Sequence, residues 1–350
     1  MELEQIRNII DRLDLTILKA LNERLEMGLL ARRRKHGIED KEREQEVLER
    51  IKQYPAVLMD AHFLEKLFLN IMSQSKALQA EDFQLMAFQG EHGAYGEVAS
   101  QQWNRDLVPI PCTRFDAVFE GVLSGIYDYG IVPVENSLGG NVEQVNRLMI
   151  NTPLHVIGAV KIPIHLCLLA LPGTDHREIR TVYSHPQALS QCRRFMARNN
   201  LEPVPHNDTA GAARMLSEKG LRGSAAIASR LAARLYGLEV IKENVEDLSS
   251  NMTRFLVLSK EENKQEGNKC SIVFSTQHKA GTLFRVLERF ARNDINLTRI
   301  ESIPYEPGSY AFFLDFEGSL KRPAVMETLK AAEDVTTQFR VLGCYQEETK

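Results

Sequence analysis

The sequence has little of what marks secreted, metal-binding or membrane proteins. Its five cysteines are scattered and form no Cys-x-x-Cys pair, which predicts reduced thiols, no disulfide and no zinc site. The longest apolar run, residues 164–171, is far too short to cross a bilayer. The chain opens on a charged amphipathic segment, where a signal peptide would have an apolar one. These absences favour a cytoplasmic protein that has no membrane segment.

Strong charge of either sign is also lacking. The formal net charge of −4 gives no general attraction to phosphate backbones, so nucleic acid is not an expected partner. At 350 residues the chain is longer than one hydrophobic core usually serves, and we expect two or three domains.

The first part of the chain has the periodicity of three amphipathic helices, over residues 2–35, 41–53 and 59–78. An apolar stripe on the first consists of Ile6, Ile10, Leu13, Ile17 and Leu21. Arg24 and Lys35 fall on its continuation. Burial of an unpaired cation costs several kcal/mol, so these two residues predict an anionic ligand. Arg7 lies roughly 90° from the centre of the stripe and could instead reach a neighbouring subunit.

The polar positions of this region resemble those of the all-helical chorismate mutases. The matching residues are Arg7, Arg24, Lys35, Asp40, Arg43, Ser75 and Gln79. The resemblance implies that chorismate rearranges to prephenate through orientation and electrostatics alone. It implies that Arg24, with Arg7 from a partner chain, holds the carboxylates, and that Lys35 and Gln79 donate to the ether oxygen. The competing interpretation is a coiled coil or basic arm whose charges are merely exposed.

From about residue 83 to 262, short apolar strands alternate with helices, which is typical of an α/β domain. Strands expected at 85–88, 130–134, 181–184 and 255–258 each adjoin a polar loop, and such loops commonly bind ligands. The glycines of the loop 90–96 do not have dinucleotide-binding spacing. A carboxylate is the better candidate ligand for that loop.

Four polar stretches in this segment resemble motifs of prephenate dehydratases. They are Glu-Asn-Ser at 135–137, Ser-His-Pro-Gln at 184–187, Asn-Asp-Thr-Ala at 207–210 and Thr-Arg-Phe at 253–255. The resemblance implies two α/β lobes around a cleft, like the periplasmic solute-binding proteins, with the chain crossing between lobes near His155 and again near Asn207 or later.

The same resemblance implies that prephenate loses its ring carboxylate as CO2 and its ring hydroxyl as water. Thr253 would be nearest this chemistry, with the proton supplied through water or Glu135. The assisting residues would be Glu135, Asn136, Ser137 and Gln187. Arg254 could bind a carboxylate, and a structural ion pair is the alternative.

After a polar linker at 260–269, the tail has the βαββαβ order of a ferredoxin-like unit, with strands at 270–275, 296–304, 310–317 and 336–343. It resembles the ACT regulatory domain of many prephenate dehydratases, in which phenylalanine binds between paired domains. The implied contacts are Gly281, Thr282, Leu283, Asn296, Leu297, Glu301 and Ser302. Thr282 and Ile303 depart from the family's usual alanine and arginine. A purely dimerising tail is the alternative.

The sequence therefore predicts a multidomain enzyme with an all-α mutase domain (1–82), an α/β bilobal dehydratase domain (83–262) and an α+β ACT domain (268–350). It would convert chorismate to phenylpyruvate without a cofactor, under feedback by phenylalanine, as a homodimer or higher oligomer. Two alternatives stay open: a non-catalytic ligand sensor, and an enzyme whose helical domain only regulates the dehydratase. Acceptance of arogenate and channelling of prephenate are also open.

Overall fold

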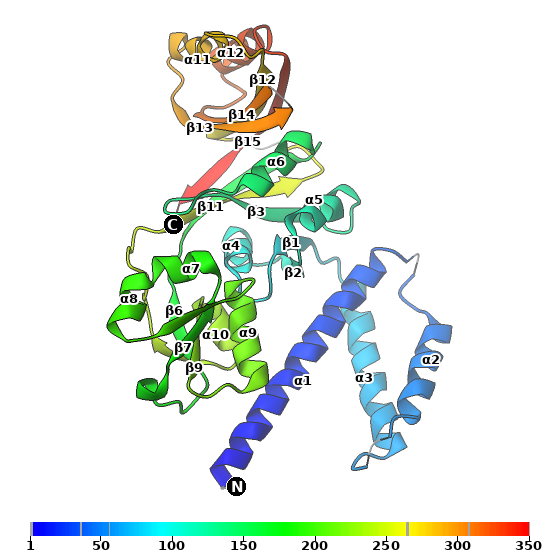
Figure 1. The fold of residues 1–350 in the computed structure, drawn as a ribbon. Coiled ribbons are helices and arrows are strands. Elements are labelled where there is room, and N and C mark those ends of the chain that lie inside the picture. Colours follow the sequence, from blue (N-terminus) through cyan, green and yellow to red (C-terminus); the bar gives the residue numbers. More distant parts are fainter. Residues whose placement is uncertain (1–2, 36, 56, 264–265, 307–308, 350) are drawn as a thin grey trace. The chain divides into compact units, whose positions relative to one another are not determined.

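The computed structural model describes residues 3–35, 37–55, 57–263, 266–306 and 309–349 (Figure 1). The chain divides into two compact units, Met1–Gln84 and Leu85–Lys350. No helix among the described residues is long and apolar enough to cross a membrane.

The first unit consists of helices α1 (Leu3–Arg32), α2 (Lys41–Lys52) and α3 (Ala61–Ala80). An aspartate caps the start of each of the two shorter helices, because Asp40 accepts a hydrogen bond from the Arg43 amide and Asp60 accepts one from the Phe63 amide. Both α1 and α2 pack against α3. The predicted all-α domain of three helices is confirmed.

Helix α1 ends three residues earlier than its pattern predicts. Its last turn tightens, since the amides of Arg34 and Lys35 bond to the carbonyls three residues back, at 3.0 and 3.4 Å. Lys35 therefore lies in the turn that follows α1, and the prediction that it continues the apolar stripe is wrong.

The second unit begins with two lobes, each built on one sheet (Figure 1). The first lobe contains β1 (Leu85–Gln89), β2 (Val108–Cys112), β3 (Tyr129–Asn136), β4 (Gly140–Asn141), β5 (His155–Pro163) and β11 (Met252–Ser259). The second contains β6 (Cys167–Ala170), β7 (Thr181–Ser184), β8 (Glu202–Pro205), β9 (Ser224–Ala228) and β10 (Glu239–Lys242). The bilobal α/β fold is confirmed.

Helices follow most strands of the two lobes. They are α4 (Tyr95–Trp103), α5 (Phe115–Leu123), α6 (Glu143–Asn151), the 3-10 turn η1 (His176–Glu178), α7 (Pro186–Gln191), α8 (Arg193–Arg198), α9 (Thr209–Lys219) and α10 (Arg230–Leu235). The chain leaves the first lobe after β5 and returns before β11. The predicted crossing near His155 is wrong, because His155 begins a strand that stays in the first sheet.

The C-terminal region has the predicted order of strands and helices. It comprises β12 (Lys269–Thr276), α11 (Thr282–Arg292), β13 (Leu297–Glu306), β14 (Ser309–Glu317), α12 (Pro323–Glu333) and β15 (Gln338–Thr349). Both helices pack on the sheet around a core that includes Phe274, Phe290 and Phe316. The ferredoxin-like α+β fold is confirmed.

Strand β15 extends well past its predicted end at residue 343 and joins two sheets. Residues 338–345 pair antiparallel with β12, whereas residues 346–349 pair in parallel with β5 of the first lobe. Gly343 stands at the junction, where an added Cβ would lie 2.0 Å from the Val156 carbonyl oxygen. The first lobe and the C-terminal domain therefore share one continuous sheet.

Candidate active sites

A cavity of about 400 Å³ lies among the three helices of the first unit. The predicted residues that line it are Arg24, Lys35, Asp40, Arg43, Ser75 and Gln79. Arg7 is exposed on α1 and lies 17 residues before Arg24, which is about 25 Å along a helix. The structure therefore gathers six of the seven predicted residues and leaves Arg7 outside this cavity.

The cavity carries an excess of positive charge. Five cationic side chains line it, against the carboxylates of Asp40 and Glu44. Lys35 Nζ lies 3.2 Å from Asp40 Oδ2, and Lys76 Nζ lies 3.1 Å from Glu44. The Arg43 amide, followed by the Lys35 side chain, lowers the pKa of Asp40, so this carboxylate keeps its partners until the pH falls below its ordinary range. Arg24 has no carboxylate partner in the part of the chain that the structure describes.

Two features of this cavity were missed from the sequence. One is the Lys76–Glu44 pair, which lies on the cavity wall. The other is Gly28, where an added Cβ would lie 2.6 Å from Ser75 Oγ. Because Gly28 has no side chain, α1 can approach α3 closely at Ser75, whose hydroxyl accepts a 3.0 Å hydrogen bond from Gln79 within α3.

A larger cavity of about 580 Å³ opens between the two lobes of the second unit. Of the predicted dehydratase residues, Asn136, Gln187 and Thr253 line it. His185, Asn207 and Asp208, from the other predicted motifs, line it as well. All four motifs therefore contribute to one cleft.

Thr253 is held by a network that fixes the direction of its hydroxyl. Asn136 Nδ2 donates to Thr253 Oγ1 at 2.8 Å, and Asn136 Oδ1 accepts from the amides of Leu138 and Gly139 at 3.1 and 2.6 Å. The two backbone donors settle which end of the Asn136 amide faces Thr253. Because the hydroxyl oxygen already accepts a hydrogen bond, its proton can be donated into the cleft.

The hydrogen-bond donors that face the cleft come from neutral groups. No lysine or arginine is among the described residues that line it. Helix α4 begins at this cleft, and its first residue is preceded by Ala94, which offers no side-chain cap. The amides of that first turn, with the nearby asparagine and glutamine side chains, can accept a carboxylate without placing a full positive charge beside it.

Gly139 brings the two lobes into contact at the cleft. An added Cβ at Gly139 would lie 1.7 Å from Gln187 Nε2. We expect Gly139→Ala to displace the flexible Gln187 side chain and to lower the dehydratase turnover that the resemblance implies by about tenfold, because misplaced contacts weaken orientation of the substrate. Steady-state kinetics on prephenate measures this effect. The double variant with Gln187→Ala should be no slower than Gln187→Ala alone, and additive losses would contradict this mechanism.

The structure places Glu135, Ser137 and Arg254 outside this cleft. Ser137 Oγ accepts from the Met252 amide and donates to the Ser250 carbonyl, which closes the loop before β11. Arg254 is buried on the opposite face of β11 and is paired with Asp315 and Glu347. Glu135 lies 3.8 Å from Arg254 and 3.4 Å from Arg299. Arg254 therefore forms structural ion pairs, which was the alternative to binding a substrate carboxylate.

A third cavity, of about 450 Å³, lies in the C-terminal domain. Gly281, Thr282, Leu283 and Ser302 line it, as predicted for an effector site, together with His278 and Tyr310. Asn296 instead bonds to Glu317, Leu297 packs in the domain core, and Glu301 bonds to Asn141 of β4. The structure thus separates the predicted residues into four that share a cavity and three that do not.

The two departures from the family pattern have local explanations. The Thr282 hydroxyl donates to the carbonyls of Gln277 and Lys279, each at 2.9 Å, and so ties down the loop before α11. Ile303 is buried in an apolar cluster that spans the C-terminal domain and the first lobe. Neither residue places a new charge in the third cavity.

Three family models match consecutive parts of the chain. Chorismate mutase type II matches residues 6–80, prephenate dehydratase matches residues 86–263, and the ACT domain matches residues 271–334. A plant relative, arogenate dehydratase/prephenate dehydratase 2, chloroplastic, from Arabidopsis thaliana is 38% identical over 278 residues, covering 75% of this chain and 73% of its own length.

Two solved structures are similar to the second unit. A prephenate dehydratase from Arthrobacter aurescens in complex with L-Phe has a TM-score of 0.70 and 30% identity, covering 75% of this chain and 89% of its own. A protein described as GqqA, a novel type of quorum quenching acylase, has a TM-score of 0.71 and 32% identity, covering 76% of this chain and 98% of its own.

The prediction of a cytoplasmic protein is corrected by the plant relatives, several of which are named as chloroplastic. The prediction used reduced cysteines as an argument for the cytosol. All five cysteines are indeed free and buried, but free thiols are compatible with any reducing compartment, so they do not identify one.

The order of the three matches along the chain agrees with the order of the helical unit, the bilobal cleft and the ferredoxin-like domain. With more than half of its length in the central match and a relative of 38% identity, the chain belongs to the prephenate dehydratase family, with a chorismate mutase type II domain before the dehydratase and an ACT domain after it.

Proposed function

We propose that this chain is a bifunctional enzyme that rearranges chorismate to prephenate and then converts prephenate to phenylpyruvate. The proposed domains are residues 1–82 for the mutase, 83–262 for the dehydratase and 268–350 for regulation. The observation that carries the proposal is the Thr253 hydroxyl, which is fixed by Asn136 in a cleft of suitable size. The proposed reactions need no cofactor.

In the proposed mutase step, the helical cavity binds a dicarboxylate in a folded conformation. Arg24 and its cationic neighbours would hold the carboxylates, while Lys35 and Gln79 donate to the ether oxygen as its bond breaks. Donors that are already in place stabilise the charge that develops on this oxygen and need not reorganise during the reaction. Asp40 contributes by orienting Lys35, from which it lies 3.2 Å.

In the proposed dehydratase step, the bond between the ring and its carboxylate breaks, and its electron pair enters the ring. The ring hydroxyl leaves from the opposite carbon and takes up a proton, so that CO2, water and phenylpyruvate form. The Thr253 hydroxyl would donate to the leaving oxygen, with the proton resupplied from water. A cleft wall without lysine or arginine suits this step, because an adjacent cation would stabilise the carboxylate that must be lost.

Arogenate is the second candidate substrate, because plant relatives are named arogenate dehydratases. It differs from prephenate by an amino group in place of the side-chain keto group, and its product would be phenylalanine. The ratio of kcat/KM values for prephenate and arogenate, measured on the same preparation, decides which substrate is preferred.

Phenylalanine is the proposed effector, bound at the cavity that contains Gly281, Thr282, Leu283 and Ser302. The complex of the Arthrobacter aurescens relative with L-Phe supports this choice. The experiment that tests the whole proposal is turnover of the purified protein on chorismate, with and without phenylalanine. Accumulation of phenylpyruvate supports it, and ligand binding without turnover would favour the sensor.

We also propose a homodimer that forms through α1. Its stripe residues Leu13 and Ile17 are each 57% exposed in the single chain. We expect Leu13→Glu, combined with Ile17→Glu, to shift the protein to monomer in sedimentation and to abolish mutase turnover, because Arg7 must come from a partner. A matched control is Leu58→Glu, at a residue that is 97% exposed but lies outside the helices. An unchanged sedimentation coefficient in the double variant would contradict the assignment.

A further inference from the structure

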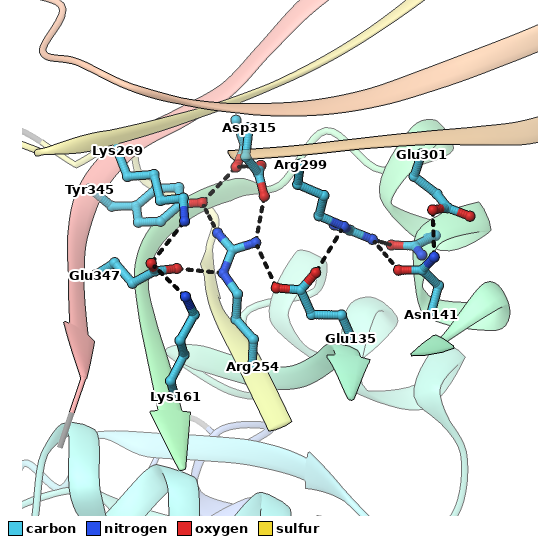
Figure 2. Close-up of polar contacts among 12 residues, drawn as sticks. Glu135, Asn141, Lys161, Arg254, Lys269, Arg299, Glu301, Asp315, Tyr345 and Glu347 are labelled. Carbon is cyan, nitrogen blue, oxygen red and sulfur yellow. Dashed lines mark hydrogen bonds and ion pairs between the residues drawn. The ribbon is translucent and has the colours of Figure 1, made fainter. Parts of the chain in front are cut away.

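A cluster of ionic side chains joins the first lobe to the C-terminal domain (Figure 2). Its centre at Arg254 and Asp315 is buried, whereas Glu135 and Lys161 are partly exposed. From the first lobe it includes Glu135, Asn141, Lys161 and Arg254, and from the C-terminal region it includes Lys269, Arg299, Glu301, Asp315, Tyr345 and Glu347. The cations Lys161, Arg254, Lys269 and Arg299 are matched by the carboxylates of Glu135, Glu301, Asp315 and Glu347. Its centre, Arg254, lies on the face of β11 opposite to Thr253, whereas Asn141 at its edge also lines the cleft.

Arg254 is the centre of this cluster. Its side chain comes from β11, and its guanidinium donates hydrogen bonds to three groups of the C-terminal region. Nη1 donates to Asp315, Nη2 donates to Tyr345 Oη at 2.8 Å, and Nε donates to Glu347 at 2.5 Å. Only 2% of Arg254 is exposed. Its donors are therefore committed to another domain and cannot reach a substrate.

The carboxylate of Glu347 is itself held by several cations. Lys269 Nζ lies 2.8 Å from it and Lys161 Nζ lies 3.2 Å from it. Burial acts to raise the pKa of Glu347, but Arg254, Lys269 and Lys161 together lower it below its ordinary value. The Glu347 carboxylate that pairs with Arg254 is therefore ionised at neutral pH.

Arg254 directly follows Thr253, and the two side chains point to opposite faces of β11. Thr253 is opposite Asn136 on β3, and Arg254 is opposite Glu135. On the β3 side the register shifts between Arg254 and Phe255, one residue past Thr253, whereas the pairing with β5 is regular from Met252 to Val257. A bulge allows local displacement of a strand, and the position of Thr253 then depends on what holds its neighbour.

The other strand of the pair is held from the same domain. Glu135, the neighbour of Asn136, lies 3.4 Å from Arg299 Nε of β13. Arg299 also donates to Asn146 at 3.1 Å, and its guanidinium lies 4.6 Å from the centre of the Phe313 ring. Both residues of the Thr253–Asn136 hydrogen bond thus have a neighbour that is attached to the C-terminal domain.

We propose that Arg254 is a positioning residue for the dehydratase step: anchored by Asp315 and Glu347 of the C-terminal region, it keeps β11 in the register in which Thr253 meets Asn136 and faces the cleft. This inference rests on the proposed dehydratase function. In this proposal the C-terminal domain helps to position the active-site residue Thr253. This role is separate from the binding of an effector.

Arg340 offers a matched control. It is also an arginine that links the C-terminal domain to the first lobe, since it donates from β15 to the carbonyls of Met149 and Thr152 at the end of α6. Among the described residues, no hydrogen bond or ion pair joins Arg340 to β11 or to the ionic cluster. Arg340→Lys therefore loosens the same pair of domains without acting on Thr253.

The test compares full-length Arg254→Lys and Asp315→Asn with Arg340→Lys, by steady-state kinetics on prephenate and by thermal unfolding. We expect kcat to fall by about tenfold or more in the first two variants with KM within about threefold, and kcat of Arg340→Lys to stay within about twofold. In single turnover, Thr253→Ala with Arg254→Lys should be no slower than Thr253→Ala alone, because Arg254 acts through Thr253.

Each outcome bears on the proposal. Equal kcat values for the three variants, or losses that merely follow the thermal midpoints, would overturn it. If Arg254→Lys does not fold, Asp315→Asn decides alone, since it keeps the shape of the side chain. A wild-type protein that does not turn over prephenate contradicts the proposed function, whereas an active wild type with unaffected variants contradicts only this inference.

Discussion

Replacement of Thr253 by alanine is expected to lower the dehydratase kcat by about 10²–10³-fold, the loss typical of removing one fixed donor to the reacting oxygen. The hydroxyl accepts from Asn136 and faces the cleft, so no other described group stands ready to donate at that point. The change removes few apolar contacts and should leave the thermal midpoint nearly unchanged. Stopped assays of phenylpyruvate formed from prephenate measure the loss.

Two comparisons make this experiment specific. Thr253→Ser keeps the hydroxyl and should retain turnover within about tenfold of wild type, because only the methyl group that fixes its rotamer is lost. Mutase turnover on chorismate should be unaltered in both variants. Dehydratase turnover of Thr253→Ala equal to wild type would remove Thr253 from the proposed mechanism.

Lys35→Ala is expected to lower the mutase kcat by about 10²–10³-fold, for the related reason that a cation leaves the position where negative charge develops. Lys35 lines the helical cavity and pairs with Asp40. Once the lysine is removed, the Asp40 carboxylate keeps its hydrogen bond from the Arg43 amide but loses its cationic partner, which further disfavours a dianionic substrate. Disappearance of chorismate, followed by its absorbance, gives the rate.

The matched control is Lys66→Ala, an exposed lysine on α3 that does not line the cavity. It should keep wild-type mutase turnover. Dehydratase turnover on added prephenate should survive both changes, which separates a local effect from misfolding. Equal mutase turnover in Lys35→Ala and Lys66→Ala would contradict the proposed mutase site. It would favour the alternative in which the helical domain only regulates the dehydratase.

The fold could be predicted from the sequence wherever periodicity and turn residues act locally. The caps at Asp40 and Asp60 and the βαββαβ order follow from such signals. The extension of β15 could not be predicted, because pairing with β5 depends on a strand 188 residues earlier. Local patterns contain no information about a partner so distant in the chain.

For the candidate site, chemistry-bearing motifs pointed to Asn136, Gln187 and Thr253, which do meet in one cleft. Strand alternation also requires that Thr253 and Arg254 face opposite sides, but the sequence did not tell which side would meet another domain. Gly28 and Gly139 were missed because a glycine offers no chemistry of its own. Their roles become visible only when the neighbouring Ser75 and Gln187 are in place.

The shared sheet has a consequence for how the chain matures on the ribosome. Strand β5 is synthesised early, yet residues 158–161 at its outer edge pair with residues 346–349 of β15. Until those residues emerge, the edge offers unpaired amides and carbonyls to any other nascent chain, a known source of aggregation. Completion of the sheet of the first lobe therefore waits until β15 has been translated.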